Sequence, residues 1–84
     1  MKYRKKPVEI EALQWTGDNL AEMEEFVVNQ NGKQFDTVGT SLFIHTLEGS
    51  MRAKPTDYII KGVKNEFYPC DESIFKITYE QIVT

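Results

Sequence analysis

Two side chains of this 84-residue chain have the chemistry of a catalytic centre, and the chain holds one of each: Cys70 and His45. A nucleophilic cysteine needs its thiolate stabilised by a cation, a helix N-terminus or a partner base. Asp71 and Glu72 follow Cys70 directly, and their carboxylates would raise the pKa of its thiol. We therefore predict that Cys70 packs as a small apolar residue at a structural corner after Pro69, and that the chain has no catalytic residues.

The same two residues limit the metal and cofactor chemistry of the chain. One cysteine cannot form an internal disulfide, and one histidine offers no Cys/His cluster for a metal. We expect no metal and no cofactor, and a reducing, intracellular compartment. His45 reads as a partly exposed strand residue; the competing role is a ligand or general base. An enzyme that uses Cys70 and His45 together is the third functional hypothesis.

Basic residues in the second half of the chain suggest a site for anions. Arg52 and Lys54 share one face of an expected strand, and Lys61 and Lys64 lie in the hairpin that follows. Such a patch suits the phosphate of a nucleotide or an acidic partner protein, and Tyr68 beside it would stack on a base. An ordinary charged sheet face is the competing interpretation.

The aromatic residues Trp15, Tyr58, Phe67 and Tyr68 have two competing roles. Side chains alternate between the two faces of a strand, so some of them would point away from the helices and form a stacking platform. Packing in the core is the other role, and we expect it for most of them.

Charge is distributed unevenly along the chain, whose net charge is −3. Four of the ten basic residues fall within residues 1–6, so residues 7–84 carry six basic and thirteen acidic side chains. An acidic body repels a phosphate backbone, which argues against general nucleic-acid binding. The basic start is either a contact for nucleic acid or an acidic partner, or a frayed lead-in to the first strand.

The length of the chain fits a single domain, residues 1–84. Because so small a domain buries a limited core, a homo-oligomer or an aromatic-rich core would add stability. No apolar run is long enough to cross a membrane, and the start of the chain lacks the features of a secretory leader.

Hydrophobic spacing predicts the first strand and the first helix. Residues 7–15 alternate apolar and polar side chains and change phase at Leu13, which indicates a bulge or a strand covered on both faces. A helix follows, with Asn19 as its N-cap, Glu22 completing a capping box and Gly32 as a left-handed C-cap.

The rest of the chain reads as short strands joined by turns. Residues 48–49 are expected to connect one hairpin, and residues 64–65 a second. Between the hairpins, Pro55 followed by Thr56 predicts a type I turn. The expected strands are residues 33–39, 41–47, 50–54, 58–63 and 66–69.

A C-terminal helix is expected after Asp71, which is a suitable cap, with Phe75, Tyr79 and Ile82 along one face. The predicted order is then β-α-β-β-β-β-β-α. This is an α+β domain in which two helices cover one face of a mostly antiparallel sheet of about five to six strands.

The densest motif of the chain is YIIKGVKNEFYPC, residues 58–70, followed closely by IFKITYE. Together with residues 2–19 and 47–57, it resembles a family of small uncharacterised proteins of tailed bacteriophages and prophages, whose core reads PGDYIIKGVxGEFYPC. Thr56 and Asn65 stand at turn positions where that pattern has glycine. The resemblance implies a phage gene product in the cytoplasm of a bacterial host, and it supplies no catalytic residues.

These observations predict a small accessory protein, not an enzyme, that binds a protein of the host or of the phage. The alternative is a binder of a nucleotide-like small molecule, such as an antagonist of host defence signalling. In that case Arg52, Lys54, Lys61 and Lys64 would contact the anion and Tyr68 would stack. A structural role in the virion stays open.

Overall fold

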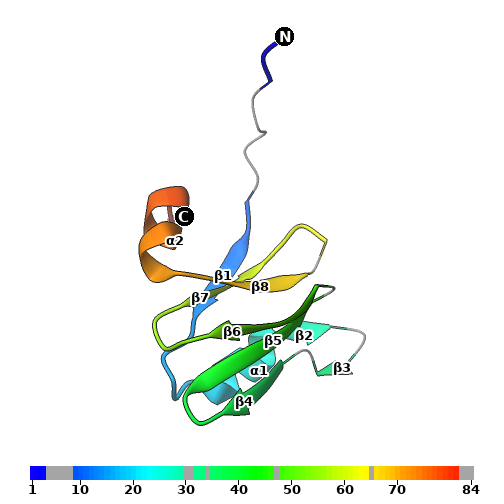
Figure 1. The fold of residues 1–84 in the computed structure, drawn as a ribbon, viewed down its shortest axis with the longest axis vertical. Helices are drawn as coiled ribbons and strands as arrows, with labels where there is room; N and C mark the ends of the chain where they lie inside the picture. The colour runs from blue at the N-terminus through cyan, green and yellow to red at the C-terminus, as the bar shows by residue number, and fades with distance from the viewer. Residues whose placement is uncertain (4–8, 30–31, 34, 47, 65, 82–84) are drawn as a thin grey trace.

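The computed structural model describes residues 1–3, 9–29, 32–33, 35–46, 48–64 and 66–81 (Figure 1). Its order of elements confirms a small α+β domain with two helices. The elements are β1 (Glu11–Gln14), α1 (Leu20–Phe26), β2 (Val28–Asn29), β3 (Gly32–Lys33), β4 (Phe35–Val38), β5 (Ser41–Thr46), β6 (Gly49–Ala53), β7 (Tyr58–Lys61), β8 (Phe67–Cys70) and α2 (Glu72–Thr78). None of the described helices is long and apolar enough to cross a membrane.

The strands form two antiparallel three-stranded sheets, so the expectation of one sheet was wrong. The upper sheet of Figure 1 has the order β1-β7-β8 and the lower sheet the order β4-β5-β6, while β2 and β3 pair only with each other. The sheet divides because β1 pairs with β7, far along the chain, and not with the strands that follow it in sequence.

The main core combines the inner faces of both sheets with α1. Alternation along β5 turns Leu42 and Ile44 inward, and the upper sheet contributes Ile59 and Phe67. The members of this core are Trp15, Met23, Val27, Phe35, Leu42, Ile44, Ala53, Ile59 and Phe67.

The upper sheet is covered on both of its faces. Leu13 lies opposite Ile59 and packs against the main core, whereas Tyr58, on the other face, stacks on Phe75 of α2. The register of β1 with β7 is unbroken over all four residues of β1. The change of phase at Leu13 therefore reflects burial on two sides and not a bulge.

The helix α1 begins where the sequence predicts, but without the expected capping box. The Asn19 side chain makes no cap hydrogen bond. Its Oδ1 accepts from the Thr16 N–H at 2.9 Å, and its Nδ2 donates to the Gln14 carbonyl at 2.9 Å. Asn19 therefore fixes the turn that precedes the helix, and the predicted reciprocal pair with Glu22 was wrong.

The helix α1 is also shorter than predicted. It ends at Phe26, because β2 and β3 pair directly after it, and Gly32 lies in β3 instead of capping the helix. The β-branched Val27 and Val28 at this boundary favour extended backbone over helix.

Both predicted hairpins form, with connections that differ from the expected ones. β5 ends at Thr46 opposite Gly49, so the first connection falls one residue earlier than expected. The pairing of β7 with β8 stops at Lys61 opposite Phe67, which makes the second connection longer than two residues. Asn65, expected in that turn, lies outside the described residues.

The turn between β6 and β7 is of a different type from the one expected. The Asp57 N–H donates to the Lys54 carbonyl at 3.0 Å, and Thr56 has a φ of +83°. A positive φ at the third residue of such a turn is the mark of type II, not type I. The turn is also fixed to the chain after β1, because the Thr56 N–H donates to the Trp15 carbonyl at 2.7 Å and the Trp15 N–H to the Asp57 carbonyl at 2.8 Å.

Candidate functional site

The basic residues predicted to bind an anion do not come together. The Nε of Arg52 donates to Ser41 Oγ at 3.0 Å on the outer face of the lower sheet. Lys54 follows the end of β6, and its Nζ lies 2.6 Å from Asp57 Oδ1 and 3.2 Å from Asp71 Oδ1. Hydrogen bonds to these two carboxylates raise the pKa of Lys54. Its charge is thus engaged within the fold.

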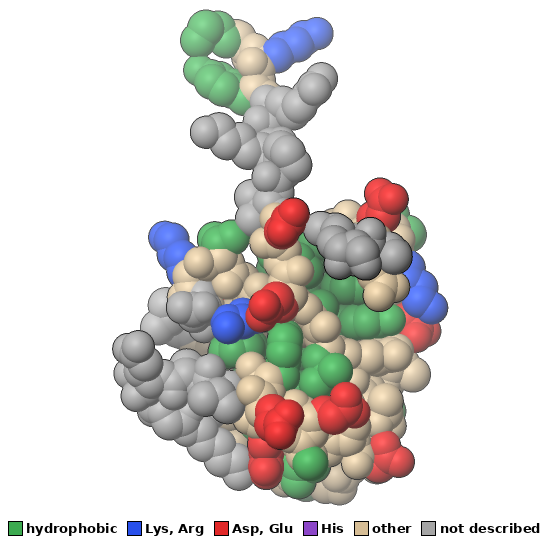
Figure 2. Space-filling view, turned by 180° about the vertical axis from the view of Figure 1, so that it is seen from behind, with side chains coloured by type: hydrophobic (Ala, Val, Ile, Leu, Met, Phe, Trp, Pro, Cys, Tyr) green, Lys and Arg blue, Asp and Glu red, His purple; other side chains and the backbone are tan. Residues whose placement is uncertain are grey.

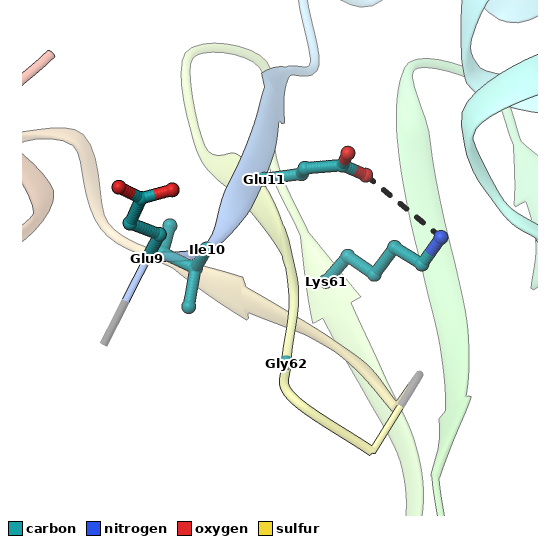
Figure 3. A pocket seen from close by; sticks show the side chains of 5 residues that line it. All are labelled: Glu9, Ile10, Glu11, Lys61 and Gly62. Carbon is teal, nitrogen blue, oxygen red and sulfur yellow. Dashed lines mark ion pairs between the residues drawn. The ribbon is translucent and has the colours of Figure 1, made fainter. Parts of the chain in front are cut away.

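Lys61 borders an open hollow of about 340 Å³ beside β1 and the end of β7 (Figure 3). Its Nζ lies 3.8 Å from Glu11 Oε2. The hollow is lined by Glu9, Ile10, Glu11, Lys61 and Gly62. Two carboxylates against one ammonium group give it a negative lining, which disfavours a phosphate.

Lys64 is exposed in the connection between β7 and β8, where its backbone N–H donates to Glu66 Oε2 at 2.9 Å. On the face of the molecule seen in Figure 2, the Lys and Arg side chains lie at separate points, whereas acidic side chains gather at the lower end, where α1 lies. The described residues therefore form no continuous basic patch on this face.

Of the four aromatic residues predicted as a platform, two belong to the main core. Trp15 and Phe67 are buried, and Phe67 meets Phe26 edge to face with ring centroids 5.7 Å apart. Tyr58 and Tyr68 are half-buried on the opposite face of the upper sheet, where α2 covers them.

Cys70 and His45 are not brought together. Cys70 is half-buried on the side of β8 that faces α2, and its Sγ donates to the Asp71 carbonyl at 3.6 Å. Burial, followed by the charges of Asp71 and Asp57, raises the pKa of this thiol. His45 lies on the exposed face of the lower sheet. The arrangement that a cysteine-dependent enzyme would need is not formed by these two residues.

An aromatic stack holds the inner face of α2 against the upper sheet. The rings of Tyr58 and Phe75 are stacked, with centroids 3.9 Å apart and planes 7° from parallel, and Tyr79 follows 5.1 Å from Phe75. Burial and a hydrogen bond with Tyr79 raise the pKa of Tyr68 to about 12. The prediction that Phe75 and Tyr79 lie on the same, inward face of the helix was thus correct. Ile82, the third residue predicted for that face, lies outside the described residues.

Polar contacts fix the N-terminal end of α2. Asp71 is the N-cap, as predicted, and its Oδ2 accepts from the Ser73 N–H at 2.9 Å. Hydrogen bonds with Ser73 and Lys54 hold the pKa of Asp71 at about 2. Gln14 of β1 adds a further contact, donating to Glu72 Oε2 at 2.7 Å. A seven-residue helix is marginal by itself, so these contacts help to hold α2 in place on the domain.

The outer face of α2 carries two exposed isoleucines, Ile74 and Ile77, which we call the isoleucine ridge. Their exposed fractions are 58% and 86%. Residues three apart lie side by side on a helix, so the two form one apolar strip. Phe75 and Tyr79 occupy the inner face, so α2 is apolar on two sides. A helix with two apolar sides is typical of one that is covered on both, and here the upper sheet covers the inner side.

The isoleucine ridge could have been found in the sequence. The motif IFKITY contains two apolar pairs in different phases, Ile74 with Ile77 and Phe75 with Tyr79. Only the second pair entered the prediction, because it continues to Ile82 at the spacing of a single amphipathic stripe.

Comparison of the chain with protein-family models, with curated proteins and with solved structures finds no match. The resemblance to phage proteins therefore stays a prediction. Within the described ranges, no three or more His, Cys, Asp and Glu side chains gather as a potential metal site.

Proposed function

We propose that this chain is a small phage accessory protein that works in the bacterial cytoplasm by binding a protein of the host or of the phage, through the isoleucine ridge. The observation that supports it is the exposure of Ile74 and Ile77 on a helix whose other side is already packed. Exposed apolar side chains gathered on one surface are a common mark of a protein interface.

The dispersal of the predicted anion contacts favours a protein partner over a nucleotide-like ligand. Lys54 is paired with two carboxylates, and Lys61 faces an acidic hollow. Tyr68, the expected stacking residue, is engaged with Tyr79. By contrast, the residues beside the ridge on the outer face of α2, Ser73 and Thr78, are uncharged, so a partner could cover it without burying an unpaired charge.

The test compares two double variants after co-purification from phage-infected cells, with bound partners quantified by mass spectrometry. I74S/I77S removes the ridge, while V38S/V63S removes two residues of similar exposure, 69% and 68%, elsewhere on the surface. Full burial of each isoleucine is worth about 1.5–3 kcal/mol, so we expect a loss of partner affinity of roughly a hundredfold or more in the first variant.

The control variant should keep the partner, and both should unfold at the urea concentration of the parent. A partner that stays bound to I74S/I77S and is lost from V38S/V63S would place the interface elsewhere. A bound species of nucleotide size, lost on reversal of Arg52 and Lys54, would favour the small-molecule alternative.

A further inference from the structure

The exposed face of the lower sheet carries a chain of three polar side chains from three strands. His45 of β5 lies directly opposite Ser50 of β6, and its Nδ1 is 2.9 Å from Ser50 Oγ. Its Nε2 is 2.6 Å from Oδ2 of Asp36 on β4. A carboxylate, an imidazole and a hydroxyl thus follow one another in hydrogen-bonded order on three paired strands.

The chemistry of the three groups determines where the protons lie. An ionised carboxylate only accepts hydrogen bonds, so the Nε2–H of His45 donates to Asp36. The lone pair of a neutral imidazole is then on Nδ1, which accepts the hydrogen bond that Ser50 Oγ–H donates. This is the order of groups in serine hydrolases, with the roles of the two ring nitrogens exchanged.

The chain's three serines have different environments, which makes Ser50 distinct. Ser41, on the same face of the same sheet, accepts a hydrogen bond from Arg52 Nε at 3.0 Å. Ser73 donates to the carboxylate of the cap Asp71 at 2.5 Å. Only Ser50 has its hydroxyl hydrogen-bonded to an imidazole nitrogen, Nδ1 of His45. The carboxylate of Asp36 binds the other ring nitrogen and so leaves Nδ1 as the proton acceptor.

We propose that Ser50 is a nucleophile for activated acyl esters, with His45 as its base and Asp36 as the residue that positions the imidazole. In the step, a bond forms between Ser50 Oγ and the acyl carbon, and the bond from that carbon to the leaving oxygen breaks. The proton passes from Oγ to Nδ1 of His45 and then to the leaving oxygen, so the products are an acyl-serine and an alcohol or phenol. Nothing is oxidised or reduced.

The surroundings of Ser50 determine the class of ester. The side chains of His45 and Asp36 are 42% and 61% exposed, so an ester can reach them directly from solvent. Phe43 is half-buried on the same face, opposite both Asp36 and Arg52, and provides an apolar surface for an aromatic leaving group. A short acyl chain on an aryl oxygen therefore suits this face. The proposal is independent of the isoleucine ridge.

The test treats the full chain with p-nitrophenyl acetate and maps the acetyl groups by peptide mass spectrometry. Hydroxylamine removes acetyl groups from oxygen and leaves those on lysine nitrogen. Treatment with it therefore distinguishes acetylated hydroxyl groups from acetylated lysines. General base catalysis typically accelerates a reaction about 10²–10⁴-fold, and the exposure of this site to solvent reduces that effect. We therefore expect Ser50 to be acetylated at least about tenfold faster than Ser41 and Ser73. S50A should lose this fast site, and H45Q should slow it to the rate of the other two serines.

The contribution of Asp36 has its own readout in the nitrogen chemical shifts of the His45 ring. The proposal requires the Nε2–H tautomer in the parent chain and loss of that preference in D36N, with slower acetylation of Ser50. Equal rates at all three serines, an unchanged Ser50 rate in H45Q with the fold intact, or an Nδ1–H tautomer in the parent would each overturn it.

Discussion

Replacing Thr56 by glycine should make this domain more stable. Thr56 has a φ of +83°, a region that costs an L-residue roughly 1–2 kcal/mol and is especially poor for a β-branched side chain. Glycine avoids that cost but loses about 0.5–1 kcal/mol through the greater freedom of the unfolded chain. The backbone hydrogen bonds of this turn, from the Thr56 N–H to the Trp15 carbonyl and from the Asp57 N–H to the Lys54 carbonyl, do not depend on the Thr56 side chain, so T56G retains them.

The net gain expected for T56G is therefore about 0.5–1 kcal/mol, or about 2–8 °C in melting temperature for a domain of this size. Urea unfolding followed by circular dichroism measures it. T56A keeps a Cβ at the same φ and should stay within about 0.5 kcal/mol of the parent. G17A introduces the opposite change, since Gly17 has a φ of +95° and a Cβ there would lie 3.3 Å from Pro55 Cγ, so it should destabilise. A T56G variant less stable than the parent, or a T56A variant that gains as much, would refute the reasoning.

Three further predictions concern the attachment of α2. F75A should lower the free energy of unfolding, measured by the same urea assay, by about 2–3 kcal/mol. This is at the low end of the range for a fully buried phenylalanine, because the stack on Tyr58 is half-exposed. I77A removes an exposed side chain and should change the free energy of unfolding little. The pKa of Asp71 is lowered to about 2, so its ionised form stabilises the fold above about pH 4, and acid unfolding curves should show that this contribution is lost towards pH 2 and absent in D71N. The pKa of Tyr68 is raised to about 12, so its protonated form stabilises the fold below about pH 10; stability should fall between pH 10 and 12, and a tyrosinate absorbance step near pH 12 should be missing from Y68F.

Local signals predicted most of the elements of this fold, but not the short pair β2 and β3. The start of α1 after Asn19, the cap at Asp71 and the phase of Phe75 all follow from a few neighbouring residues. The division into two sheets was missed because the pairing of β1 with β7 is set by contacts between distant segments, which no local pattern encodes.

The candidate sites were harder to predict, for two physical reasons. A hairpin connection placed one residue too late moves every cross-strand partner by two residues, so His45 would lie opposite Arg52 instead of Ser50. The role of Lys54 could not be read from its own strand, because Asp57 and Asp71, which engage it, meet only after β7 and β8 have paired.

The most direct test of the proposed function is site-specific photocrosslinking in phage-infected cells. A photoreactive amino acid is placed at Ile77 in one chain and at Val63, of comparable exposure, in another. The account predicts a discrete adduct with one host or phage protein from position 77 and none from position 63. No adduct at position 77 above the level at position 63, or an adduct only with a second copy of this chain, would contradict it.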